Sequence, residues 1–147
     1  MPVNDIRKVK ADLRSLYKKK RMQLPEKIKN SMDSSILNRV TALKQYKSSK
    51  QVFTYVSKDI EVDTIEFIKK ALKDGKKVGV PRCITDKRLM EFYYIESLSQ
   101  LESGAFGVLE PDPSKCRSVT DFSNGFCIVP GLSFDSDGFR LGYGKGY

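Results

Sequence analysis

Apolar residues recur at three- and four-residue steps over the first third of the chain, which is the spacing of one face of a helix. Residues 4–22 are predicted to form a helix that Asn4 or Asp5 caps, with an apolar stripe formed by Ile6, Val9, Leu13, Leu16 and Tyr17. Pro25 suits the first turn of a second helix. Its predicted buried stripe is Ile28, Met32, Ile36, Val40 and Leu43. We therefore expect an N-terminal pair of helices, followed by a polar connection at Lys47–Lys50.

The hydrophobic period then changes. Gln51–Val56 is rich in β-branched and aromatic residues, which predicts a strand. A helix is expected to begin at Asp63 or Thr64 and to end at Gly75, with an inner face of Ile65, Ile68 and Leu72. Lys76–Pro81 predicts a second strand that the proline ends. A strand, a helix and a strand within about thirty residues form a βαβ unit, which indicates a parallel sheet covered by helices.

Two further segments predict strands, Met90–Ile95 and Phe126–Pro130. The continuous apolar run of Phe126–Pro130 is typical of a buried central strand. The length of 147 residues fits one domain. The predicted fold class is therefore α/β, with the helical pair leading into the sheet.

Composition excludes several kinds of site. The chain has no histidine, which excludes a Ser-His-Asp or Cys-His catalyst and a histidine-ligated metal. Its three cysteines, Cys83, Cys116 and Cys127, form no CxxC pair and are expected to be reduced thiols. No apolar run reaches the roughly 20 residues that span a bilayer, and the N-terminus has no signal-peptide pattern. We expect a cytoplasmic protein without a membrane partner.

The net charge of +9 is unevenly distributed, because residues 1–50 hold 14 basic residues against 4 acidic ones. On a helical projection Lys10 and Arg14 lie one turn apart at the edge of the apolar stripe, and Arg21 follows two turns further along. Such a pair can meet a phosphate or carboxylate in a crevice beside the helix. A solvated basic face is the alternative.

The last eight residues, Arg140–Tyr147, read RLGYGKGY. This spacing of glycines matches neither a Walker A loop nor a GxGxxG fingerprint. The glycines nevertheless allow backbone N–H groups to approach phosphate oxygens closely, and Arg140 and Lys145 add positive charge. The sequence therefore predicts either an anion-binding loop or a flexible turn.

Taken in order, five stretches resemble the 5-formyltetrahydrofolate cyclo-ligase family: Lys10–Arg14, Tyr55–Thr64, Val80–Pro81, Phe106–Pro111 and Val129–Tyr147. The resemblance runs over the whole chain, and its last stretch is the most specific. It implies a three-layer α/β sandwich with a mostly parallel, Rossmann-like sheet. It also implies an ATP-dependent reaction of 5-formyltetrahydrofolate, in a monomer without a nucleic-acid partner. ATP phosphorylates the formyl oxygen, N10 attacks the activated carbon, and phosphate leaves to give 5,10-methenyltetrahydrofolate.

The resemblance also implies two sets of site residues. The ATP set is Lys10, Arg14, Arg140, Leu141, Gly142, Tyr143, Gly144, Lys145, Gly146 and Tyr147, with Lys145 and Arg140 as the catalytic residues. The folate set is Val56, Glu61, Phe106, Tyr143, Gly144, Lys145, Gly146 and Tyr147. Phosphoryl transfer depends on positioning and charge neutralisation more than on a protein base, with Mg²⁺ shared between phosphate oxygens, so the lack of histidine is no obstacle.

The family continues this last motif with a tyrosine and an aspartate, and the aspartate is the implied magnesium ligand. Here that position lies beyond Tyr147. We therefore expect a domain that is truncated at its C-terminus and supplies no metal ligand of its own. A non-catalytic remnant of the family and a small basic nucleic-acid-binding module are the alternatives. The nucleic-acid-binding alternative is weakened because the charge is balanced after residue 50: residues 51–147 hold 13 basic against 14 acidic residues.

Overall fold

The structure is a computed structural model that describes residues 5–144, apart from the side chain of Phe106. Its α-helices are α1 (Ile6–Met22), α2 (Glu26–Ala42), α3 (Lys44–Ser48) and α4 (Ile65–Lys73). The strands are β1 (Gln51–Thr54), β2 (Lys77–Ile84), β3 (Leu89–Ile95), β4 (Leu101–Ser103), β5 (Leu109–Pro111), β6 (Arg117–Ser118), β7 (Gly125–Ile128), β8 (Ser133–Phe134) and β9 (Arg140–Leu141). Two 3₁₀ turns are η1 (Leu98–Gln100) and η2 (Ala105–Gly107).

The two N-terminal helices form as predicted. Asp5 caps α1, because its carboxylate accepts a hydrogen bond from the backbone N–H of Arg7 at 3.0 Å. The predicted polar connection after α2 is wrong in part, since Lys47 belongs to the short helix α3. The cause is Tyr46, whose ring packs at 5.7 Å from that of Phe67 and is buried in the core.

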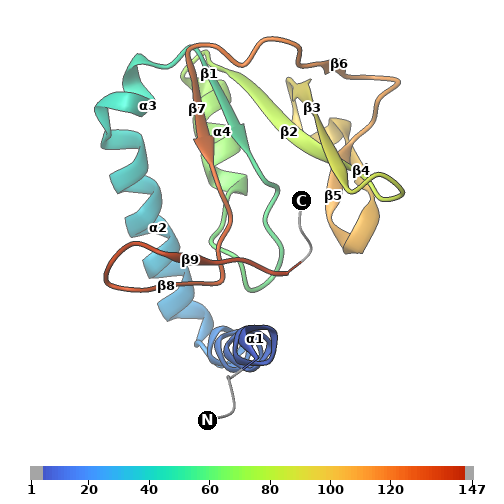
Figure 1. The fold of residues 1–147 in the computed structure, drawn as a ribbon. Helices are drawn as coiled ribbons and strands as arrows, with labels where there is room; N and C mark the ends of the chain where they lie inside the picture. The colour runs from blue at the N-terminus through green and yellow to red at the C-terminus, as the bar shows by residue number, and fades with distance from the viewer. Residues whose placement is uncertain (1–4, 145–147) are drawn as a thin grey trace.

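Five strands form a mixed sheet in the order β6-β3-β2-β1-β7 (Figure 1). Strand β1 runs parallel to β2 and to β7, which confirms the βαβ unit. Strand β3 is antiparallel to both β2 and β6, so the sheet is not mostly parallel. Strand β7, expected at the centre, lies at one edge, and Cys127 within it is exposed.

The predicted end of a strand at Pro81 is also wrong, because β2 continues to Ile84. The pairing of β2 with β1 ends at Gly79, and from there β2 pairs with β3 alone. A proline lacks the N–H that a central strand needs, but it is tolerated where one edge of a strand is free. Pro81 therefore lies where the sheet narrows to a hairpin.

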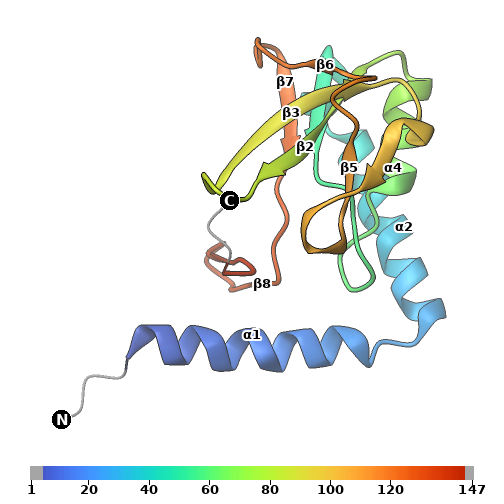
Figure 2. The ribbon, with the colours of Figure 1, turned by 90° about the vertical axis from the view of Figure 1, so that its right-hand side faces the viewer.

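Helices α2, α3 and α4 pack on one face of this sheet, and Figure 2 shows α2 and α4 on the same side. The core on this face is formed by Tyr46, Val52, Val56, Phe67, Ile68, Ala71, Val78, Val80 and Ile95. On the opposite face the ring of Phe53 covers Gly79 and Gly125, where an added Cβ would lie 2.7 Å and 2.6 Å from it. Within residues 5–144 no helix covers that opposite face, so the described chain has two layers and not three.

The apolar stripes of the helical pair are largely exposed, so the predicted burial of the second stripe is wrong in part. Ile28 is 50% and Met32 51% exposed. Val40 packs against the core as predicted, and Leu37, which the prediction left out, packs there with it. Helix α1 crosses below the carboxyl ends of β1 and β7 (Figure 2). Neither α1 nor any other described helix is long and apolar enough to cross a membrane.

Candidate active site

Helix α1 meets the C-terminal stretch Arg140–Tyr147, called the glycine loop from here on and described as far as Gly144, at Arg14. The Nε of Arg14 donates a hydrogen bond to the carbonyl oxygen of Gly142 at 3.0 Å. A Cβ added at Gly144 would lie 3.2 Å from the same guanidinium, and the backbone of Gly144 has a φ of +83° that favours glycine. The loop therefore needs glycine here both for its conformation and to let Arg14 approach.

A cavity of about 540 Å³ opens beside this contact. Its floor is apolar and comes from three strands and the segment after β7: Pro81, Met90, Phe92, Cys127, Ile128, Val129 and Pro130. Its rim carries Arg14, Arg140 and the glycine loop, together with Tyr55 and Tyr143. Such a cavity offers a flat apolar surface on one side and positive charge with exposed backbone on the other.

Arg140 stands where the cavity meets a second groove between α1 and the β8–β9 hairpin. Its Nη1 donates to the carbonyl oxygen of Pro130 at 2.7 Å, and the same nitrogen lies 3.0 Å from the Cβ position of Gly142. Lys10 lines this second groove and not the 540 Å³ cavity. Arg14 therefore lines the cavity and Lys10 lines the second groove, and Arg140 lines both.

Two tyrosines and Glu61 form a polar group beside the cavity. The hydroxyl of Tyr143 is buried and has no hydrogen-bond partner among the described residues. The carboxylate of Glu61 accepts from the backbone N–H of Lys58 at 2.9 Å. Burial raises the pKa of Glu61, and the charge of Glu61 in turn helps burial to raise the pKa of Tyr55 and Tyr143.

Comparison with known proteins decides the family. The model of the 5-formyltetrahydrofolate cyclo-ligase family matches residues 6–147. This chain belongs to that family. It is 34% identical over 141 residues to the probable 5-formyltetrahydrofolate cyclo-ligase of Schizosaccharomyces pombe, covering 94% of this chain and 69% of that protein. It is 29% identical over 147 residues to the enzyme of Mus musculus, covering 97% and 72%.

Two solved structures of the same family are similar to the fold. The 5,10-methenyltetrahydrofolate synthetase of Aquifex aeolicus superposes with a TM-score of 0.81 at 32% identity, covering 95% of this chain and 69% of that one. The synthetase of Mycoplasma pneumoniae gives a TM-score of 0.62 at 25% identity, covering 94% and 73%. The comparisons do not support the alternatives of a nucleic-acid-binding module or a remnant without the family's activity.

The remaining site residues that the family resemblance implied lie in the core, in a strand or outside the described residues. Val56 is 2% exposed, packs in the hydrophobic core and does not line the 540 Å³ cavity. Leu141 is half-buried in β9, where its carbonyl accepts from the N–H of Leu132 at 2.8 Å. The predicted positions Lys145, Gly146 and Tyr147, and the side chain of Phe106, lie outside the described part of the structure.

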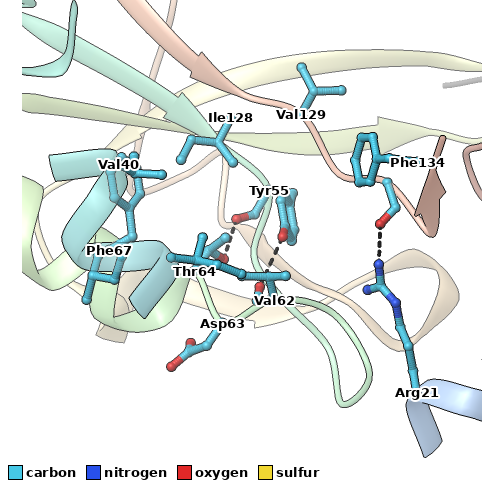
Figure 3. A pocket seen from close by; sticks show the side chains of 13 residues that line it. Arg21, Val40, Tyr55, Val62, Asp63, Thr64, Phe67, Ile128, Val129 and Phe134 are labelled. Carbon is cyan, nitrogen blue, oxygen red and sulfur yellow. Dashed lines mark hydrogen bonds between the residues drawn. The ribbon is translucent and has the colours of Figure 1, made fainter. Parts of the chain in front are cut away.

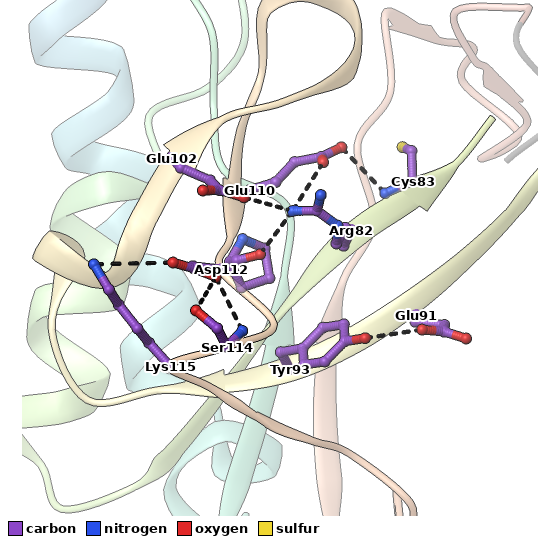
Figure 4. A network of polar contacts seen from close by, with 10 residues as sticks. Arg82, Cys83, Glu91, Tyr93, Glu102, Glu110, Asp112, Ser114 and Lys115 are labelled. Carbon is purple, nitrogen blue, oxygen red and sulfur yellow. Dashed lines mark hydrogen bonds and ion pairs between the residues drawn. The ribbon is translucent and has the colours of Figure 1, made fainter.

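The hairpin that carries η2 is held to the sheet by a polar network (Figure 4). Glu110, 3% exposed, accepts a hydrogen bond from the N–H of Cys83 at 3.1 Å and lies 3.9 Å from the guanidinium of Arg82. Arg82 also donates to Glu102 at 2.9 Å. This network places η2 against the loop after β1, since a Cβ at Gly107 would lie 3.2 Å from the Nζ of Lys58.

Sequence reasoning assigned no role to Arg21, although its place on the α1 projection was noted. Its Nη2 donates to the carbonyl oxygens of Gly131 and Leu132 at 2.8 and 2.6 Å, and its Nη1 donates to Ile60 at 3.1 Å. Figure 3 shows this side chain reaching from α1 to the edge of a smaller, mainly apolar cavity of about 240 Å³. The signal in the sequence is the helical projection, which places Arg21 on the same face of α1 as Arg14.

The described residues form no multi-ligand metal cluster. Residues 5–144 bring together no group of three histidine, cysteine, aspartate or glutamate side chains that could hold a metal ion. Magnesium is commonly held by one or two carboxylates together with phosphate oxygens and water, so no described side chain is assigned as its ligand.

Proposed function

We propose that this chain catalyses the ATP-dependent cyclisation of 5-formyltetrahydrofolate to 5,10-methenyltetrahydrofolate. The observation that carries the proposal is the 540 Å³ cavity, which combines an apolar floor with a rim of Arg14, Arg140 and the glycine loop. A reduced folate and a nucleotide each have a flat ring system, and the nucleotide adds a chain of phosphates. The two sides of the cavity match these two kinds of group.

The nucleotide phosphates would lie at the rim. In the described structure Arg14 uses only its Nε, in the bond to Gly142, and its terminal nitrogens make no other hydrogen bond with residues 5–144. Those nitrogens can donate to phosphate oxygens in the planar, paired geometry of a guanidinium. Arg140 and the backbone N–H groups of the glycine loop add further donors, which together offset the charge that builds up on a transferring phosphoryl group.

The folate would lie with its ring system on the strand floor. Its formyl oxygen, an amide-type oxygen, is a poor leaving group until ATP transfers its γ-phosphoryl group to it and releases ADP. The lone pair of N10 then forms a bond to the formyl carbon, N10 loses its proton, and the C–O bond breaks to release phosphate. Catalysis of such a phosphoryl transfer depends on positioning the formyl group at the phosphate rim and on neutralising the charge that develops there.

Three parts of the proposal are predictions from the family resemblance. Lys145 and Arg140 are proposed to act on the reacting phosphate, and the hydroxyl of Tyr143 and the carboxylate of Glu61 to bind polar groups of the folate. Among residues 5–144 the buried hydroxyl of Tyr143 has no hydrogen-bond partner. This favours its role, because a buried hydroxyl without a partner is unfavourable until a ligand supplies one. Magnesium is proposed to enter with the nucleotide.

The test is a stoichiometric assay with 5-formyltetrahydrofolate, ATP and Mg²⁺, in which 5,10-methenyltetrahydrofolate and ADP are measured together by chromatography. One ADP is expected per product molecule. Arg14→Ala is expected to lose activity, whereas Arg39→Ala, on the exposed face of α2, should keep it. Product without ADP, or no product from the wild-type chain, would contradict the proposal.

A further inference from the structure

Arg21 joins the two loops that leave the carboxyl ends of neighbouring parallel strands. It lies in the last turn of α1, and its Nη1 donates to Ile60 in the loop after β1. Its Nη2 donates to Gly131 and Leu132 in the loop after β7. Figure 3 shows the side chain reaching from α1 toward that loop. One side chain therefore connects α1 to both loops at once.

Each of these loops leads directly to a group of the proposed site. Ile60 is followed by Glu61, whose carboxylate is fixed by the N–H of Lys58. Leu132 donates its N–H to Leu141 at 2.8 Å, and Leu141 precedes Gly142 in the glycine loop. Movement of Arg21 would thus be passed to the glycine loop at the rim of the cavity and to Glu61 beside Tyr55 and Tyr143.

Arg21 does not itself line the 540 Å³ cavity. Its charge also lacks a carboxylate partner, because among the described residues it forms no ion pair and donates only to carbonyl oxygens. Burial raises the pKa of Glu61, and the guanidinium of Arg21 opposes that rise. A side chain arranged in this way orders backbone and does not compete for the ligand.

We infer that Arg21 is a positioning residue, which sets the separation of the Glu61 loop and the glycine loop by holding the carbonyls of Ile60, Gly131 and Leu132 on one planar guanidinium. This inference rests on the proposed function, because it assigns the two loops to one substrate cavity. The requirement is for arginine itself. A lysine has a single nitrogen on a flexible stem and cannot donate to two loops in a fixed plane.

The decisive variant is Arg21→Lys, which keeps the charge and removes the fork, with Arg39→Lys on the exposed face of α2 as the matched control. Amide hydrogen exchange is expected to rise roughly tenfold in peptides covering residues 57–63 and 129–134 together, because a charged hydrogen bond is lost on each loop. Exchange in β1 and β2 should stay unchanged. Arg39→Lys should match the wild type throughout.

Steady-state kinetics supply the second measurement. Arg21→Lys is expected to raise the KM for both 5-formyltetrahydrofolate and ATP, by roughly tenfold each, because both sides of the cavity lose their spacing. Loop exchange that does not change, that rises equally throughout the sheet, or that rises without any change in KM would overturn the inference. If the wild-type chain makes no product, the proposed function fails, and the exchange pattern alone then decides whether Arg21 holds the two loops.

Discussion

The Nε of Arg14 and the carbonyl oxygen of Gly142 lie 3.0 Å apart, although 128 positions separate the two residues in the chain. This bond fixes the glycine loop against the opening helix, and the terminal nitrogens of the guanidinium make no hydrogen bond with residues 5–144. It is the contact that unites the two cationic segments recognised in the sequence.

Replacement of Arg14 by alanine is expected to weaken ATP binding by about tenfold to a hundredfold, because a hydrogen bond to a charged group contributes roughly 1.5–3 kcal/mol. The affinity for 5-formyltetrahydrofolate should fall as well, since the glycine loop loses its anchor. Isothermal titration with each ligand measures both effects. Arg7→Ala, on the exposed start of the same helix, is the control. Unchanged ATP affinity in Arg14→Ala would remove Arg14 from the site.

Glu61 gives a pH-dependent prediction for stability. Burial raises the pKa of this carboxyl above its usual value of 4.5, so the native state favours the protonated form. Its favourable contribution is therefore full below pH 4.5 and is lost as the pH rises through the native pKa. Glu61→Gln, which can still accept from the N–H of Lys58, is expected to be more stable than wild type at pH 7 and equal to it at low pH.

Urea unfolding at several pH values checks this expectation, with the exposed Glu66→Gln as the control. A Glu61→Gln variant that is less stable than wild type at pH 7 would show that the carboxylate is needed for the fold. The same variant separates structure from function. A raised KM for 5-formyltetrahydrofolate with unchanged ATP affinity is expected if Glu61 contacts the folate.

Gly104 is expected to be intolerant of any side chain. A Cβ at this position would lie 2.3 Å from the carboxyl carbon of Glu110, which is buried and bound to the N–H of Cys83. The φ of Gly104 is −126°, so its backbone is ordinary and the penalty is steric. Gly104→Ala should lower the free energy of unfolding by about 2–4 kcal/mol, because Glu110 must leave its partners.

Gly138→Ala is the matched control for this prediction. Its Cβ would meet nothing within 4 Å, but its φ of +89° is strained for alanine. A loss of roughly 1 kcal/mol is expected there, from the backbone alone. Chemical denaturation of both variants gives the comparison. Equal losses would mean that the β4–β5 hairpin moves easily and does not depend on the Glu110 network.

The sequence pattern predicts individual strands but not their order in the sheet, and it predicts a strand that ends at Pro81. In the structure β2 ends at Ile84 and β3 begins at Leu89, so only residues 85–88 connect them. A connection this short allows only an antiparallel hairpin, since a parallel crossover needs a dozen or more residues. The sequence thus predicts β2 and β3 as strands, whereas the expected mostly parallel sheet does not include their antiparallel pairing.

The helical stripes show a second limit. Helix α2 carries two apolar faces, and the periodicity does not tell which one meets the sheet. Leu37 packs inward with Val40, whereas Ile28 and Met32 point outward. The position of Arg14 beside Gly144 was predictable, because the motif and the helical projection agreed. The role of Arg21 depends on three carbonyls that only the tertiary structure brings together.

Cys127 offers a chemical probe of the cavity. It is exposed and lines the cavity floor, whereas Cys116 is buried and Cys83 is partly buried. Although the residue is exposed, partial desolvation raises the pKa of the Cys127 thiol above its usual 9.0, so little thiolate is present at pH 7. Alkylation by iodoacetamide is therefore expected to be slow at pH 7, to accelerate as the pH rises toward and beyond 9, and to reach Cys127 before the other two thiols.

Peptide mass spectrometry follows the three cysteines separately in one reaction. A bound 5-formyltetrahydrofolate molecule should slow the modification of Cys127 severalfold, because it covers the strand floor, and should leave Cys83 unaffected. A Cys127→Ser variant serves as the control, since it should lose the fast-reacting site and keep its ligand affinity. If the folate protects no cysteine, or protects Cys83 and Cys127 alike, the ring system does not lie on the floor formed by β2, β3 and β7.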